Sequence, residues 1–296
     1  MGVLLFFCLL YNGAYAASLR LALVLSEHGG AYLEFSETLT ELLANSAITM
    51  QVVNVDQPLP DAELVIAAGM KAALAVARTK PAAMFAVLIP KEGYTKLQNE
   101  LTGVGGKGGA TLLSAIYLDQ PLKRQLDLIT TVLPHTRSIG ILYSNPPKEI
   151  SSLRSQMLAR KLALVERSPT ETITMHAALQ SLLQNSDVVL ALPDTEIYNS
   201  ATIRNILLTT YRNKTPVIGF SPAYVKAGAL CAVFSTPEQL SAQTLTIIMG
   251  YAESRTLPVA QHARGFEVSI NEQVARSLGL TLKSESQVRL EMGGTP

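Results

Sequence analysis

The sequence predicts an α/β protein with two lobes, each built around a mostly parallel sheet. Short apolar runs such as Leu64–Ala68, Met84–Ile89 and Val188–Leu192 show no polar alternation, which is typical of strands buried on both faces of a parallel sheet. Segments with helical spacing of apolar residues separate these runs, and repeated β-α alternation favours a doubly wound sheet. The 296 residues are enough for two lobes, each with its own core.

In the first part of the chain, strands are expected at 19–25, 48–55, 64–68, 84–89 and 115–118. Phe35, Leu39 and Leu43 share one helical face between the first two strands. Gly69 turns the third strand into an alanine-rich helix, and Pro121 suits the first turn of the helix after the fifth. The alternation of strands and helices in this part of the chain therefore favours a doubly wound parallel sheet.

In the second part, strands are expected at 138–143, 164–167, 188–192, 217–220 and 266–270. Asn199 or Ser200 can cap the helix whose apolar face carries Ile203, Ile206 and Leu207, and residues 221–227 are expected to form a polar loop. The sequence Thr236-Pro237-Glu238-Gln239 is a capping box that opens a further helix. Asn271 is expected to cap a helix that ends at Gly279.

The amino terminus has the pattern of an export signal. Val3–Leu10 is an apolar core and Ala14-Tyr15-Ala16 is a small-x-small cleavage site, which puts the mature start near Ala17. The segment is too short to cross a bilayer as a helix. Its removal leaves Cys231 alone, so we expect no intramolecular disulfide and a buried, inert thiol. These features predict a periplasmic protein.

The motifs of common enzyme classes are absent from the sequence. It contains no G-x-S-x-G, no H-E-x-x-H, no Cys-x-x-Cys pair and no G-x-G-x-x-G after the first strand. His28, His135, His176 and His262 are scattered without the spacing of metal ligands. A net charge of +1 gives no electrostatic case for binding nucleic acid. We therefore expect no catalytic residues, no metal and no cofactor.

Several long segments resemble a known family. They are LALPDTEIYNSATIRNILLTTYR at 190–212, PVIGFSPAYVKAGAL at 216–230, VIAAGMKAALA at 65–75, AIYLDQPLKRQLDLI at 115–129 and FEVSINEQVARSLGL at 266–280. The sequence resembles the ABC-transporter substrate-binding proteins, in the branch related to tryptophan-binding periplasmic proteins. The resemblance covers nearly the whole mature chain. It implies the type I periplasmic-binding-protein fold, with two Rossmann-like lobes hinged by crossovers, and a binder instead of an enzyme.

The same resemblance implies how the chain is divided. Residues 1–16 are the signal peptide, residues 17–117 form lobe 1 with 236–258 returning to it, and residues 118–235 form lobe 2 with 259–296 returning to it. The implied partners are a small-molecule ligand and an ABC permease, and the protein is expected to be a monomer. A periplasmic sensing module that signals to a membrane sensor protein remains the alternative. Neighbouring permease and ATPase genes would favour transport, whereas a sensor-kinase neighbour would favour signalling.

Ligand-binding residues are expected in the loops that follow the carboxyl ends of parallel strands, because these loops meet at one edge of a sheet. The candidates from the first lobe and the crossover are Ser26, Glu27, His28, Gly69, Lys71, Tyr117 and Asp119. The candidates from the second lobe are Tyr143, Asn145, Asp194, Thr195, Phe220, Ser221 and Tyr224.

Several candidates have an equally good structural explanation. Asp194 either binds a ligand ammonium group or caps a local turn, and Asp119 either faces the ligand or caps the helix that begins at Pro121. Gly69 either presents free helix N–H groups to a carboxylate or only permits a tight turn. Phe220 is either a stacking residue or core. Tryptophan-binding relatives show Asp-Asn at the position of Asp194-Thr195, a difference that counts against an aromatic amino acid and leaves a small amino-acid-like or organic anion as the expected ligand.

Overall fold

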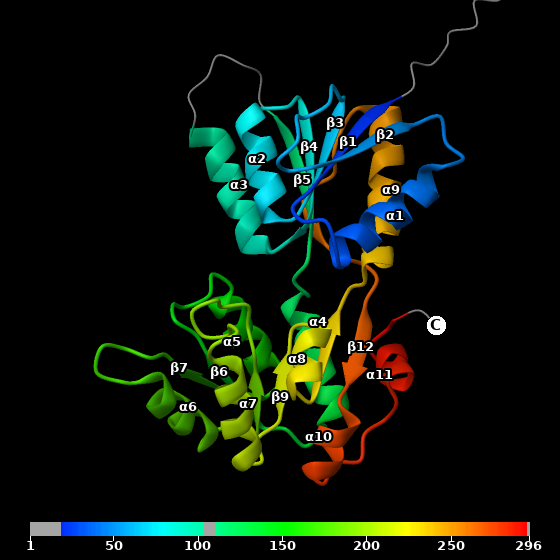
Figure 1. Cartoon of the computed structure of the whole chain (residues 1–296). Coiled ribbons are helices and arrows are strands. Elements are labelled where there is room, and N and C mark those ends of the chain that lie inside the picture. The colour runs from blue at the N-terminus through cyan, green and yellow to red at the C-terminus, as the bar shows by residue number, and fades with distance from the viewer. Residues whose placement is uncertain (1–18, 104–110, 295–296) are drawn as a thin grey trace, which may run out of the picture.

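The structure is a computed structural model that describes residues 19–103 and 111–294. Within these residues the chain forms two lobes, each with a six-stranded sheet between helices (Figure 1). The expected signal segment, residues 1–16, lies outside the described residues. No helix in the described part of the chain has the length and apolar character needed to span a membrane.

The first sheet has the strand order β11-β5-β4-β3-β1-β2, and every neighbouring pair in it is parallel. Its strands are β1 (Arg20–Leu25), β2 (Thr49–Asn54), β3 (Leu64–Ala68), β4 (Ala83–Ile89), β5 (Leu112–Tyr117) and β11 (Gln261–His262). β3 and β4 are buried along their whole length, which explains why their sequences read as unbroken apolar runs.

Two helices cover each face of the first sheet (Figure 1). One pair is α1 (Ala31–Leu43) and α9 (Pro237–Ser254), and the other is α2 (Met70–Thr79) and α3 (Lys91–Gly103). α9 comes from the later part of the chain, yet its Ser241 Oγ donates a 3.0 Å hydrogen bond to the carbonyl of Phe35 in α1. Each helix pair packs against its own apolar cluster of the sheet.

The second sheet has the order β12-β10-β9-β8-β6-β7, parallel except for the antiparallel pair β10–β12. Its strands are β6 (Ser138–Leu142), β7 (Ala163–Arg167), β8 (Val188–Leu190), β9 (Val217–Gly219), β10 (Cys231–Phe234) and β12 (Glu267–Ile270). The helices are α4 (Leu122–Val132), α5 (Ile150–Ala159), α6 (Met175–Leu183), α7 (Ile203–Arg212), α8 (Pro222–Ala227), α10 (Glu272–Ser277) and α11 (Glu285–Glu291). Cys231 is fully buried in this lobe, and burial raises the pKa of its thiol.

Three segments of the described chain connect the lobes: β5 to α4, β10 to α9, and β11 to β12. One hydroxyl links them, because Ser235 Oγ donates to the carbonyl of Gly265 at 2.6 Å and accepts from Gln120 Nε2 at 2.9 Å. Residues 259–296 were expected to return to lobe 2, but β11 at Gln261–His262 pairs with β5 in the first sheet. The last crossing therefore falls between His262 and Glu267.

Two helix starts differ from the sequence prediction. α7 has Thr202 at its N-cap without a side-chain cap, instead of Asn199 or Ser200. Residues 221–227 were expected to be a loop, yet they contain α8, because Pro222 stands at the first helical position with its φ already suited to a helix. The capping box at Thr236–Gln239 is confirmed. The Asn271 cap is also confirmed, by its 3.1 Å bond from Val274 N–H.

Candidate functional site: the cleft between the lobes

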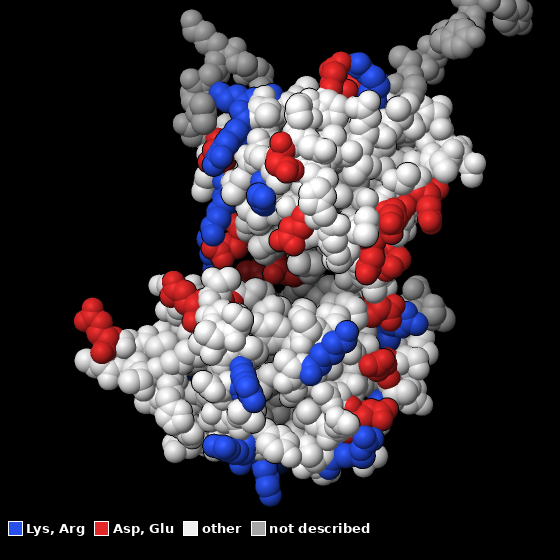
Figure 2. Space-filling model, in the orientation of Figure 1, with Lys and Arg blue, Asp and Glu red and all other residues white. Residues whose placement is uncertain are grey.

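The strand order of each sheet locates a binding crevice. In the first sheet β1 lies between β2 and β3, and in the second β6 lies between β7 and β8, so the connections diverge to opposite sides at β1/β3 and at β6/β8. Ligands of open α/β sheets bind beyond the carboxyl ends of strands at such switch points. Figure 2 shows a furrow between the two lobes with Asp and Glu side chains along it. The loops after β1, β3, β6 and β8 therefore define the candidate site.

In the first lobe, the loop after β1 is fastened to the start of α2. Ser26 Oγ accepts a 2.9 Å hydrogen bond from the backbone N–H of Ala72, one of the amides that a helix start leaves without a helical partner. Gly69 stands between them with φ of 89°, and a Cβ there would lie 2.5 Å from Ser26 Oγ and 2.7 Å from the ring of Tyr32. Only glycine fits at this crossing of three segments.

The remaining groups of this loop region are placed to meet a ligand. The amides of Met70 and Lys71, in the first turn of α2, make no hydrogen bond within the described residues. Glu27 and His28 are exposed at the end of β1, as is the Lys71 side chain. Burial, and to a lesser degree Glu27, raise the pKa of Tyr32, so its phenol stays protonated and can donate. The first lobe thus offers free backbone amides and the Tyr32 phenol as donors, together with the Glu27 carboxylate as an acceptor.

In the second lobe, Asp194 binds two loops together. Its Oδ2 accepts from the N–H and the Oγ of Ser144 at 2.7 and 2.8 Å, and its Oδ1 accepts from the N–H groups of Glu196 and Ile197 at 3.0 and 3.2 Å. A carboxylate has about four acceptor sites, and all of them are used. The geometry favours the capping role over direct contact with a ligand ammonium group. Asp194 therefore shapes the switch point of lobe 2.

Three aromatic rings of the second lobe contact one another near these loops. Phe220 and Tyr224 lie 4.2 Å apart between ring centroids, and Tyr198 lies 6.5 Å from each. The Tyr224 hydroxyl donates to the carbonyl of Tyr198 at 3.0 Å, which fixes its ring. Phe220 and Tyr224 are half-buried, whereas Tyr198 is buried. The two partly exposed rings remain candidates for stacking on a ligand.

The other candidate residues of the second lobe differ in how far they are exposed. Asn145 and Thr195 are exposed beside Ser144 and Asp194, and Ser221 is half-buried just before α8. Tyr143 is buried in the core, and its hydroxyl donates to Glu166 Oε2 at 3.0 Å. Asn145, Thr195 and Ser221 thus lie in or next to the site loops. Tyr143 instead has its partner, Glu166, within the second lobe.

The two crossover candidates also have other partners. The Asp119 carboxylate accepts from the backbone N–H of Lys91 and so caps α3, whereas α4 has Pro121 at its N-cap without a side-chain cap. Burial raises the pKa of Asp119. Tyr117 belongs to the apolar cluster on the α2/α3 face, with its ring edge-on to those of Tyr94 and His262.

One ion pair joins the lobes beside the furrow. Lys91 Nζ, after β4, contacts Glu149 Oε1, just before α5. Both side chains are partly exposed, at 44% and 40%. The pair therefore contributes little to stability, but it shows that the carboxyl ends of the two sheets face each other.

Sequence reasoning missed Tyr32, Ser144 and Tyr198. Ser144 and Tyr198 lie within or next to loops that the sequence had selected, so testing every polar or aromatic residue of those loops would have found them. Tyr32 follows the Gly29-Gly30 pair, a weaker signal. In the described residues no group of three or more His, Cys, Asp or Glu is arranged to hold a metal ion.

The comparisons agree with this geometry. A ligand-free, open substrate binding protein with adhesive properties from Clostridium difficile superposes with a TM-score of 0.69 at 16% identity, covering 90% of this chain and 96% of that one. An ABC domain from Streptococcus pneumonia in complex with L-Trp gives 0.61 at 17%, covering 93% and 99%. A conserved domain protein from Vibrio cholerae gives 0.59 at 20%, covering 94% and 100%. These likenesses confirm the predicted two-lobed periplasmic-binding-protein fold.

Among curated proteins no sequence matches the chain. The family model described as ABC transporter substrate binding protein matches residues 107–290, which is more than half of the chain. The chain therefore belongs to the ABC transporter substrate-binding protein family.

Proposed function

We propose that the chain is exported, captures a small solute between its lobes and delivers it to the permease of an ABC transporter. The observation that carries the proposal is the pairing of two fixed switch points across the furrow. Ser26 and Gly69 build one of them, and Ser144 and Asp194 build the other. Closure about the three crossovers requires that the ligand bind the closed state more tightly than the open one.

The groups in the cleft favour a ligand with a small anionic end, such as an amino acid or an organic acid. The Ser26 hydroxyl accepts from Ala72, so its own hydrogen remains available for a ligand oxygen. The amides of Met70 and Lys71 point out of a helix start, where the helix dipole favours negative charge. Across the furrow, Phe220 and Tyr224 offer ring faces for the rest of the ligand.

The first test is thermal unfolding of the chain from Ala17 onward, followed by circular dichroism, against amino acids, organic acids, nucleosides and sugars. L-tryptophan belongs in the panel because the pneumococcal structure holds it. A ligand at a hundred times its dissociation constant adds about 2.7 kcal/mol to the stability. The same ligand should shrink the radius of gyration in solution scattering. Stabilisation without compaction would contradict capture by closure.

A matched pair of variants tests the location. Tyr32→Phe removes a hydroxyl beside Gly69, whereas Tyr211→Phe removes one from an exposed ring on α7. Ligand affinity should fall in the first variant and stay unchanged in the second. Equal affinity in both would place the ligand elsewhere.

Export is tested separately. The full-length chain should appear in the osmotic-shock fraction at its processed size, and Ala14→Asp with Ala16→Asp should leave it unprocessed. Recovery of an unprocessed wild-type chain in the cytoplasm would contradict export.

A further inference from the structure

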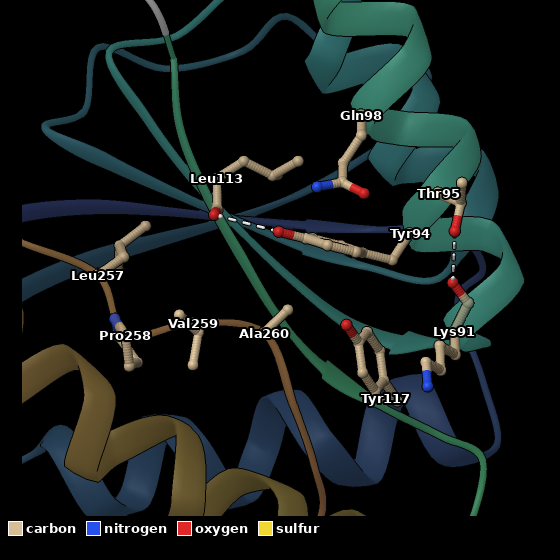
Figure 3. A pocket seen from close by; sticks show the side chains of 10 residues that line it. All are labelled: Lys91, Tyr94, Thr95, Gln98, Leu113, Tyr117, Leu257, Pro258, Val259 and Ala260. Carbon is tan, nitrogen blue, oxygen red and sulfur yellow. Dashed lines mark hydrogen bonds between the residues drawn. The ribbon is translucent and has the colours of Figure 1, made fainter. Parts of the chain in front are cut away.

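The third crossover, which runs from β11 to β12, is fixed to one lobe on each side of a short bridge. Before the bridge, residues 257–260 lie beside β5 (Figure 3), and His262 pairs with Tyr117 in the first sheet. After the bridge, β12 pairs with β10 in the second sheet. Residues 263–266 are therefore the part of this crossover that must absorb any change in the angle between the lobes.

One peptide unit in this bridge is held by both lobes. The buried side chain of Gln243, on α9 of the first lobe, accepts a 2.8 Å hydrogen bond from the N–H of Arg264. Arg124, on α4 of the second lobe, donates from Nη1 to the carbonyl of Ala263 at 3.1 Å. The carbonyl of Ala263 and the N–H of Arg264 belong to a single planar peptide unit. This unit, which we call the pivot peptide, is thus a rigid point common to the two lobes.

The guanidinium of Arg124 connects the pivot peptide to the rest of the hinge. Its Nη2 donates to the carbonyl of Arg264 at 3.2 Å, and its Cζ lies over the ring of Phe266, 4.4 Å from the centroid. Nη1 also donates to Gln120 Oε1, and the amide of Gln120 in turn donates to Ser235 Oγ in the second crossover. The three crossovers are therefore joined in one hydrogen-bonded network that passes through Arg124.

Arg124 holds this network without a carboxylate partner. It forms no ion pair with any described residue. Burial lowers the pKa of its guanidinium, which reflects the cost of taking a cation out of water. Because burying a charge is costly unless it is paired, stability alone does not explain an arginine at this place. What arginine supplies is a rigid fork of N–H groups, which bonds two successive carbonyls at once.

We propose that the pivot peptide is the point about which the lobes close, and that Arg124 is a positioning residue that fixes this point to the second lobe. With the pivot fixed, the lobes turn about one axis, so the loops after β1 and β3 meet those after β6 and β8 in a single register. Without it the loops meet in several orientations, and only a fraction of the molecules is competent to bind. This role of Arg124 rests on the proposed capture of a solute by closure.

The test measures the distance between the lobes in the ligand-free chain from Ala17 onward. Spin labels on Lys71→Cys and Glu196→Cys, one exposed position beside the cleft in each lobe, report this distance by double electron–electron resonance. The native Cys231 is fully buried and stays unlabelled. The labelled parent should give one narrow distance distribution. Arg124→Met, which keeps the length of the side chain but has no donors, should broaden that distribution because the pivot peptide is released from the second lobe.

The matched control is Arg160→Met. Arg160 is also a half-buried arginine that binds α4, through a 2.9 Å ion pair with Asp127, but this contact lies wholly within the second lobe. The variant should lower Tm and leave the distance distribution narrow. Gln243→Leu releases the pivot peptide from the first lobe, so it should broaden the distribution as Arg124→Met does. The double variant should broaden it no further, because both side chains hold the same peptide.

An unchanged distribution in Arg124→Met, a comparable broadening in Arg160→Met, or additive broadening in the double variant would overturn the pivot. No ligand enters these measurements, so a failure to find one would contradict the proposed function and not the pivot. The compound of the panel that stabilises the parent should bind unlabelled Arg124→Met about fivefold to tenfold more weakly, and Arg160→Met as tightly as the parent. Equal affinity in the two variants would overturn the positioning role of Arg124.

Discussion

Replacing Asp194 with asparagine tests the claim that this carboxylate holds the second switch point together. The amide nitrogen of Asn cannot accept a hydrogen bond, so two of the four donors around Asp194 lose their acceptor whichever way the amide turns. A hydrogen bond to a charged group contributes about 1.5–3 kcal/mol. Because the side chain is only half-buried, water replaces part of this, and we expect a loss of about 2 kcal/mol in all.

The assay is thermal unfolding of Asp194→Asn by circular dichroism, with Asp56→Asn as the control because Asp56 is exposed. A loss of about 2 kcal/mol corresponds to a fall of roughly 4–8 °C in Tm for a domain of this size class. Ligand affinity should also fall, since the loops after β6 and β8 would separate. If Asp194→Asn melts together with Asp56→Asn, the carboxylate does not bind the loops and the reasoning is refuted.

Three further predictions concern single side chains. Gly69→Ala should lower both Tm and ligand affinity, since a φ of 89° alone costs about 1–2 kcal/mol for a residue with a side chain. The control is Gly250→Ala on α9, where a Cβ would meet no neighbouring atom, and this variant should be neutral or stabilising. Thr244→Val should raise the free energy of unfolding measured in urea by about 1 kcal/mol, because the buried hydroxyl lacks a partner among the described residues, and a lower free energy of unfolding would show that it has one. The Arg154 guanidinium donates two hydrogen bonds to Glu166 and holds the pKa of this carboxyl below its ordinary value of 4.5. The contribution of Glu166 to stability is therefore present above pH 4.5 and is lost as the pH falls through the folded-state pKa. Glu166→Gln should flatten the curve of stability against pH in that acidic range, and an unchanged curve would exclude this role.

The sheets could be predicted from the sequence because their central strands are buried on both faces. Residues 64–68 and 84–89 can be recognised as strands from their unbroken apolar runs alone, and the capping box at Thr236–Gln239 depends on residues three positions apart. α8 could not be separated from a loop, because its six residues are too few to show a helical period.

The site was harder to predict because its contacts join distant residues. Asp194 and Ser144 are 50 positions apart, and nothing local shows that one carboxylate serves both loops. Tyr143 and Ser144 are neighbours, yet the first points into the core toward Glu166 and the second contacts Asp194. A loop can be selected from the sequence, but which of two adjacent side chains faces the cleft depends on backbone direction after the strand ends.

The interleaving of the lobes has a consequence for how the protein matures. The first lobe receives α9 and β11 only after the chain has left it and built most of the second lobe, and the second lobe receives β12 and α11 only near the carboxyl end. During synthesis neither core can close until more than four-fifths of the chain exists, and the face of α1 that receives α9 stays uncovered until then. A chain built in this way completes both cores only once its carboxyl-terminal fifth is available, so the two lobes gain their stability late and together.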